Sequence, residues 1–188
     1  MIVETVRAET KKAHADLDHS LYPYILATNN LEKYYKLLTV FYSYFQPLQQ
    51  QLDLYLNDEV VPNYATRRKP VWIKNDLEAC GIKWEEPVLC NYTPAIHSYE
   101  EALGAYYVLE GSTMGGTIIT KKLKEQLHID EMALSFFKGY GENNTIMWKE
   151  FLNQLNTVDE ILPVSQNLIA AAKESFSTFK KWIDEQYS

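Results

Sequence analysis

Apolar residues recur at intervals of three or four along most of this sequence, and no other feature constrains the fold as strongly. In residues 3–21 the apolar positions are Val3, Val6, Ala13, Leu17 and Leu21. This spacing places them on one face of an α-helix, which turns once every 3.6 residues. The same pattern returns in residues 31–56, 98–127, 145–156 and 163–185. No segment shows sustained alternation of apolar and polar residues, so we expect an all-α, multi-helical bundle with more helices than a simple four-helix bundle.

Prolines, glycines and capping residues predict where these helices begin and end. Pro47 lies inside the second helical segment and should kink or divide it. The capping box from Ser98 to Glu101 should start the next long segment, and the glycines at 111, 115 and 116 should break or bend it. The rest of the chain is expected to form a loop at 57–69, short helices at 70–80 and 131–138, and an irregular stretch at 82–97. We expect a single domain over residues 1–188.

Charge and cysteine content exclude several functional classes. The formal net charge is −7, which is opposite to the basic footprint of a nucleic-acid binder, so we expect no nucleic-acid partner. No apolar run approaches the ~18 residues of a membrane span, and residues 1–20 are too charged for a secretory signal. Cys80 and Cys90 match no metal-binding or redox spacing and should be free thiols. We therefore expect a cytoplasmic protein that does not enter a membrane.

Three polar residues share one face of the first predicted helix. Asp18 follows His14 by one turn, and Arg7 precedes it by two turns. A neutral imidazole is a good ligand for heme iron, a carboxylate one turn away can orient it, and a guanidinium about 10 Å along the axis can meet a heme propionate. The alternative is a surface histidine beside two unrelated charges. His19 is a weaker candidate, because it is rotated about 140° from His14 around the helix.

A glycine-rich run lies inside the long helix predicted from residue 98. Gly111 and Gly115 are four residues apart and share a face, as do Ser112 and Gly116. Each interior glycine costs about 1 kcal/mol relative to alanine, so three of them need a reason. Without a Cβ the helix can approach a flat ligand closely; close packing against another helix is an equally good explanation. The spacing matches neither phosphate-binding glycine motif.

Two further residues could hydrogen-bond an anion at the mouth of a pocket. Tyr106 lies five residues before Gly111, and Lys149 belongs to a later predicted helix. Taken alone, Tyr106 is typical of a core tyrosine and Lys149 of a solvated lysine.

Four segments resemble the heme oxygenase family, and in particular its bacterial biliverdin-producing branch. They are residues 6–14, 105–116, 136–141 together with 148–152, and 172–176 followed by Phe179 and Trp182. The first is similar to the family's proximal-helix motif, whose histidine binds heme iron, and the second to its distal-helix signature. The others are similar to the segment that follows and to the last helix. The resemblance covers almost the whole chain in the right order.

The resemblance implies a heme-oxygenase-like fold, with heme between the first helix and a glycine-kinked distal helix. His14 would be the axial ligand of the heme iron. Gly111 and Gly115 would let the distal helix lie close over the ring, leaving room for O2 and little else. Gly116 and Phe176 would also contact heme.

The resemblance also implies roles for polar residues, with two departures. Arg7, Tyr106 and Lys149 match positions that hold the propionates and so fix the rotation of the ring. Ser112 stands where many relatives have an aspartate that organises water for proton delivery. A hydroxyl can also hold water, although it carries no charge. Val108 replaces an arginine that is common in the animal enzymes.

The implied activity is cleavage of heme to biliverdin, Fe²⁺ and CO. Heme would be both cofactor and substrate, with O2 as co-substrate. Because no flavin or NAD motif occurs in the sequence, electrons would come from a ferredoxin or a flavoprotein reductase, and a bacteriophytochrome is a candidate acceptor of biliverdin. Three alternatives remain open: a heme-binding or heme-sensing homologue without turnover, a non-heme enzyme of the heme-oxygenase-like superfamily, and a helical interaction module.

Overall fold

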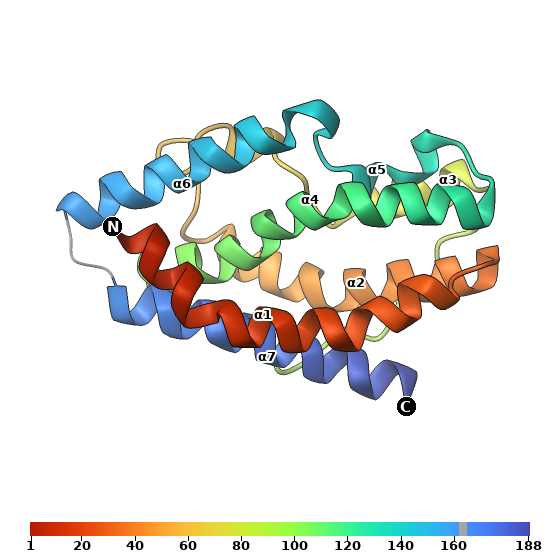
Figure 1. Cartoon of the computed structure of the whole chain (residues 1–188), viewed down its shortest axis with the longest axis horizontal. Helices are drawn as coiled ribbons and strands as arrows, with labels where there is room; N and C mark the ends of the chain where they lie inside the picture. Colours follow the sequence, from red (N-terminus) through yellow and green to blue (C-terminus); the bar gives the residue numbers. More distant parts are fainter. Residues whose placement is uncertain (162–164) are drawn as a thin grey trace.

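The computed structural model describes residues 1–161 and 165–188 and shows an all-helical chain (Figure 1). The α-helices are α1 (Ile2–Ala27), α2 (Leu31–Leu52), α3 (Val71–Ala79), α4 (Tyr99–Leu127), α5 (Ser135–Lys138), α6 (Asn144–Ile161) and α7 (Ser165–Tyr187). Short 3-10 turns lie at Tyr64–Thr66, Glu131–Leu134 and Gly141–Asn143. The described residues contain no β-strand, so the all-α prediction is confirmed. The predicted start of the last helix near Pro163 lies outside the described residues.

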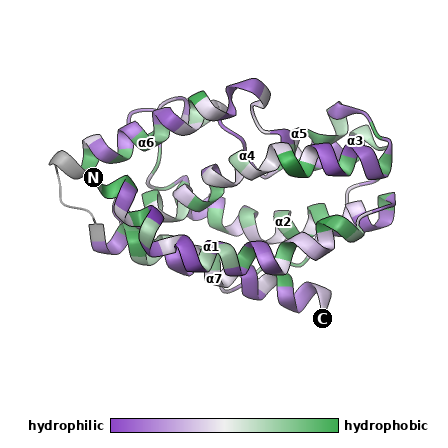
Figure 2. Cartoon of the chain, in the orientation of Figure 1, coloured by the Kyte–Doolittle hydropathy of each residue, from purple (hydrophilic) through white to green (hydrophobic). Residues whose placement is uncertain are grey.

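The long helices pack around one apolar core. Both α1 and α4 lie along α7, and α6 contacts α1 and α4 from the other side (Figure 1). Figure 2 shows hydrophilic and hydrophobic residues mixed along each long helix, as amphipathic helices require. The largest fully buried apolar and aromatic side chains include Tyr34, Tyr44, Phe45, Phe136, Phe137 and Phe151. Packing against α7 therefore fixes the positions of α1 and α4, the two helices that carry the predicted site.

Pro47 does not divide α2. A proline has no N–H, so the carbonyl of Ser43, four residues earlier, lacks its helical partner. The N–H of Cys90 donates to that carbonyl at 2.9 Å instead. The irregular segment after α3 thus completes the hydrogen bonding of α2, which ends at Leu52 rather than at residue 56.

The first helix is longer than its apolar pattern alone predicted. It runs beyond residue 21 and through Pro23, as far as Ala27. Leu21 and Ile25 continue its buried face on either side of the proline, so core packing offsets the missing helical hydrogen bond.

The sequence predicted either a break or a bend at the glycines of α4. The helix is continuous, so a break is wrong, and the bend stays a prediction. Its N-terminus confirms the predicted cap. The Ser98 hydroxyl oxygen accepts from the Glu101 N–H at 3.2 Å. The Glu101 carboxylate accepts from the N–H of His97 at 2.7 Å, one residue earlier than in a standard capping box.

A buried carboxylate joins α3 to α5. Asp76 is fully buried and accepts from the N–H of Ser135 at 2.8 Å, from the Ser135 hydroxyl, and from the N–H of Phe136 at 2.9 Å. Burial raises the pKa of Asp76, although these hydrogen bonds oppose that shift. The short helix α5 is therefore held in place by α3, and it carries Phe136 into the core.

Cys80 and Cys90 are both free thiols. Among residues 1–161 and 165–188, no helix combines the length and the apolar character that crossing a bilayer requires.

Candidate functional site

The structure leaves the His14 imidazole accessible on α1. Its side chain is 61% exposed, and its Nε2 atom lies 3.5 Å from an Asp18 carboxylate oxygen. One side of the ring packs against Phe176 of α7, with ring centroids 5.2 Å apart. His14 is thus held between a carboxylate and an aromatic ring, and its exposed edge can bind a ligand.

Contacts at the start of α4 establish its register against α1. Burial raises the pKa of the Tyr107 hydroxyl, while the nearby Arg7 guanidinium and Thr10 hydroxyl oppose this shift. Figure 1 shows α1 and α4 running in the same direction from this point. One turn beyond Thr10 is His14, and one turn beyond Tyr107 is Gly111. The histidine and the glycine run therefore lie at the same level of the two helices.

The three glycines of the run have different surroundings, and neither sequence interpretation covers all three. A Cβ built on Gly116 would lie 1.9 Å from the Phe137 carbonyl oxygen, which shows close packing against α5. A Cβ at Gly111 would lie 3.3 Å from the side chain of Trp148. A Cβ at Gly115 would meet nothing within 4 Å. Only Gly115 faces open space, so it is the residue that can admit a flat ligand.

Apolar side chains flank Gly115 on the outer face of α4. Met114 is 39% exposed and Ile118 is 66% exposed. At ~100° per residue, both lie within about 100° of Gly115 around the helix. These two side chains add apolar surface next to the open face of Gly115.

The residues predicted to bind anions do not gather at one place in the structure. Tyr106 is 1% exposed, and its hydroxyl donates to the Glu110 carboxylate at 3.2 Å. It is a core tyrosine and does not lie at a pocket mouth. Lys149 is exposed on α6, and Arg7 is exposed on α1 near Tyr107.

Sequence reasoning missed a buried ionic cluster on the inner side of α4. Arg67 and Arg68 come from the segment between α2 and α3, and both are buried. Arg67 donates to the carboxylate of Glu110, which is also buried. Tyr106 and Tyr140 donate to the other oxygen of the same carboxylate at 3.2 and 3.0 Å. The one sequence signal was the position of Glu110, a charged residue directly after the apolar run 105–109.

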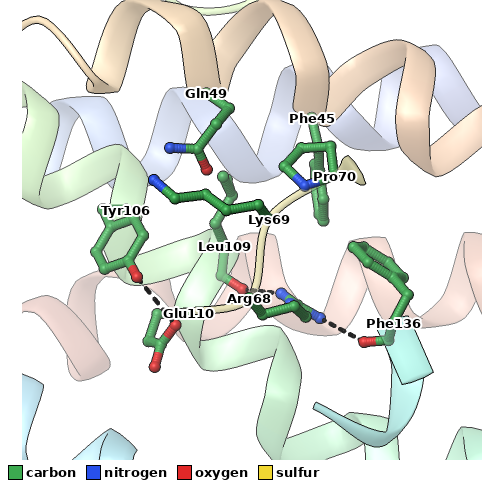
Figure 3. Close-up of a pocket in the computed structure, with 9 residues that line it drawn as sticks. All are labelled: Phe45, Gln49, Arg68, Lys69, Pro70, Tyr106, Leu109, Glu110 and Phe136. Carbon is green, nitrogen blue, oxygen red and sulfur yellow. Dashed lines mark hydrogen bonds between the residues drawn. The ribbon is translucent and has the colours of Figure 1, made fainter. Parts of the chain in front are cut away.

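Arg68 connects this cluster to Ser112. One Nη atom of Arg68 donates to the Ser112 hydroxyl oxygen at 2.6 Å. The same atom donates to the carbonyl of Leu109 (Figure 3). The Ser112 hydroxyl donates to the same carbonyl at 2.7 Å. Burial lowers the pKa of Arg68, while the Glu110 carboxylate opposes this shift.

A small cavity adjoins the cluster. It has a volume of about 10 Å³. A polar space of this size can hold a single water molecule. The residues around it are Phe45, Gln49, Arg68, Lys69, Pro70, Tyr106, Leu109, Glu110 and Phe136 (Figure 3). The cavity is too small for an organic ligand, so the inner side of α4 does not compete with the outer face as a binding site.

The residues fit a flat, apolar ring that carries a metal ion. An accessible imidazole on α1, a glycine on α4 with open space beside it, and exposed apolar side chains next to that glycine supply a metal ligand and a face for the ring. Fold and site together define an all-helical protein that can hold a planar metal complex between two helices.

Comparisons with known proteins identify the family of this chain. The heme oxygenase family model matches residues 2–185, so the chain belongs to the heme oxygenase family. It is 26% identical over 149 residues to a heme oxygenase of Xanthomonas campestris pv. campestris (strain 8004), covering 79% of this chain and 83% of that protein. The fold is similar to that of the NO- and CO-bound heme oxygenase from Neisseria meningitidis, with a TM-score of 0.73 and 19% identity. That likeness covers 100% of this chain and 92% of the other.

Proposed function

We propose that this protein is a catalytically active heme oxygenase, which converts heme to biliverdin, Fe²⁺ and CO with O2 and electrons from a separate protein. Family membership supports heme as the substrate. The observation that carries the proposal is the pairing of an accessible His14 on α1 with the open face of Gly115 on α4.

His14 would bind the heme iron on the α1 side. The separation of 3.5 Å between Nε2 and Asp18 is longer than a strong hydrogen bond, so this nitrogen can exchange the carboxylate for a metal. Phe176 would hold the imidazole in place from α7. Bound heme supplies the iron chemistry, and the protein supplies position and a dry environment.

The glycine face of α4 would cover the opposite side of the ring. Gly115 lets the helix backbone approach without a side chain in between. Trp148 lies beside Gly111 and packs against Tyr107, which limits the free space at that end of the site. Little room then remains for anything larger than a diatomic molecule and water.

Charged side chains at the edges would set the rotation of the ring. Arg7 on α1 and Lys149 on α6 are both exposed and can meet carboxylates. The Tyr106 hydroxyl is occupied by Glu110, so we leave it out of the proposed propionate contacts. Ser112 would hold a water molecule at its Oγ atom and so keep a proton source near the ring.

Electrons would come from a ferredoxin or a flavoprotein reductase, and the product would pass to a biliverdin-binding acceptor such as a bacteriophytochrome. The exposed side chains of Lys11 and Lys12, close to His14 on α1, give an acidic electron donor a place to bind.

Heme titration followed by single turnover tests the proposal. We expect a Soret band on adding heme to the purified protein, then loss of that band and formation of biliverdin when ascorbate and O2 are added. A stable Soret band without biliverdin would identify a heme-binding homologue that lacks turnover. Failure to develop a Soret band would leave a non-heme enzyme of the same fold or a helical interaction module.

A further inference from the structure

The guanidinium of Arg68 lies on the inner side of α4, behind the proposed site. Arg68 is 7% exposed. Its hydrogen bonds run to Ser112 and Leu109, and to the carbonyl of Phe136 at 3.4 Å. The guanidinium also lies over the Phe136 ring, 4.5 Å from its centroid. Packing and hydrogen bonds therefore fix Arg68 in one orientation.

These contacts determine what the Ser112 hydroxyl can do. A hydroxyl has one hydrogen to donate and two lone pairs to accept with. Its hydrogen goes to the Leu109 carbonyl, and one lone pair accepts from Arg68. A single acceptor position remains. Ser112 is half-buried and lies about 60° around the helix from Gly115, so this position borders the open face.

The buried cluster also carries an excess of positive charge. It contains two guanidiniums, Arg67 and Arg68, and one carboxylate, Glu110. Arg67 pairs with Glu110, and its second Nη atom lies 3.7 Å from the half-exposed Glu150. The hydrogen bonds of Arg68 go to a hydroxyl and two carbonyls, which are neutral acceptors. Within residues 1–161 and 165–188, Arg68 thus makes no direct ion pair, and its charge lies next to Ser112.

We propose that Arg68 is a positioning residue for the site: it fixes the Ser112 hydroxyl as a hydrogen-bond acceptor and places a positive charge behind it. This inference rests on the proposed function, since it gives Ser112 a role toward bound heme. Water at Ser112 must then donate one of its two hydrogens to Oγ, and its other hydrogen remains free to donate toward the ring. A small anion bound on that side would be stabilised by the charge.

A double-mutant cycle tests whether Arg68 acts through Ser112. The variants are R68M, S112A and the pair together, with K74M as a control on a partly exposed lysine that pairs with Glu86. We expect S112A and R68M each to slow single-turnover biliverdin formation about tenfold, the effect of losing one hydrogen bond. The double variant should be no slower than the slower single variant. Multiplied effects in the double variant would overturn the positioning role.

Azide binding to the ferric heme complex tests the charge. R68M should weaken azide binding about tenfold, while R68K keeps the charge and should stay within about threefold of the natural protein. Heme affinity should stay the same in both. Unchanged azide affinity in folded R68M would refute the electrostatic part of the proposal.

NMR of the apoprotein tests the contact without heme and without an Arg68 variant. Buried, hydrogen-bonded guanidinium protons exchange slowly, so Arg68 should give resolved Nη–H signals, and S112A should shift them. Signals that do not respond to S112A would overturn the contact even if R68M fails to fold. If the natural protein binds no heme, the proposed function fails while this measurement still decides whether Arg68 holds Ser112.

Discussion

Neighbouring glycines in α4 should respond in opposite ways to added side chains. Gly115 faces open space, so G115A should gain the helix propensity of alanine at no steric cost. That gain is about 1 kcal/mol, or a rise in Tm of about 2–4 °C for a chain of this length. G115L should fold equally well, because leucine is also a good helix former.

Gly116 has no such room. A Cβ there would lie 1.9 Å from the carbonyl oxygen of Phe137, about 1.5 Å short of ordinary contact. The backbone of α5 would have to move, and Asp76 holds that segment in place. Overpacking of this kind costs about 1–3 kcal/mol or more, which exceeds the gain in propensity. G116A should therefore lower the Tm by several degrees.

Melting curves and heme binding together separate the two roles. Circular dichroism at increasing temperature gives the Tm, and Soret titration followed by single turnover gives heme affinity and biliverdin yield. G115L should melt normally and lose heme binding or turnover. G104A is the matched packing control, because its Cβ would lie 2.1 Å from the Leu168 carbonyl oxygen on the α7 side of the helix. If G115L destabilises the fold as much as G116A, or keeps full heme affinity and turnover, the assignment of Gly115 to the ligand face is wrong.

Further predictions concern a histidine pair and a buried carboxylate. H14A should abolish turnover and weaken heme binding, whereas H19A should do little; Soret titration and biliverdin yield measure both, and full activity of H14A without added imidazole would refute the ligand assignment. D76A should lower the free energy of unfolding in urea by about 3 kcal/mol, because buried donors of Ser135 and Phe136 lose their acceptor. Burial raises the pKa of Asp76 above its unfolded value, so its contribution is greatest at low pH and is lost as the pH rises. The stability of D76N relative to the natural protein should therefore improve between about pH 4 and pH 7, and parallel pH curves would contradict this.

The sequence predicted the helices well because their signals are local. Both the periodicity and the Ser98 cap depend on a few neighbouring residues. The continuation of α1 through Pro23 and the unbroken course of α4 depend on packing against distant helices, which no local pattern records.

The same contrast between local signals and distant packing applies to the candidate site. His14, Asp18 and the glycine run are placed by their own helices, so their spacing predicted them. Arg67 and Arg68 sit in a polar segment that reads as a surface loop, and their burial depends on α4, more than 40 residues later. The environment of Tyr106 was missed for the same reason, since its partner Glu110 is held by that distant arginine.

The packing of α1 on α7 determines when the site can assemble during synthesis. The His14 ring rests on Phe176, and Glu9 pairs with Lys173, which lies 164 residues later. At the usual speed of a ribosome, roughly 10–30 s separate the appearance of these two helices. Through this interval the histidine has no partner helix to hold it, and contacts of such long range form late in folding. Heme should therefore be loaded onto the finished chain after release, rather than onto the nascent one.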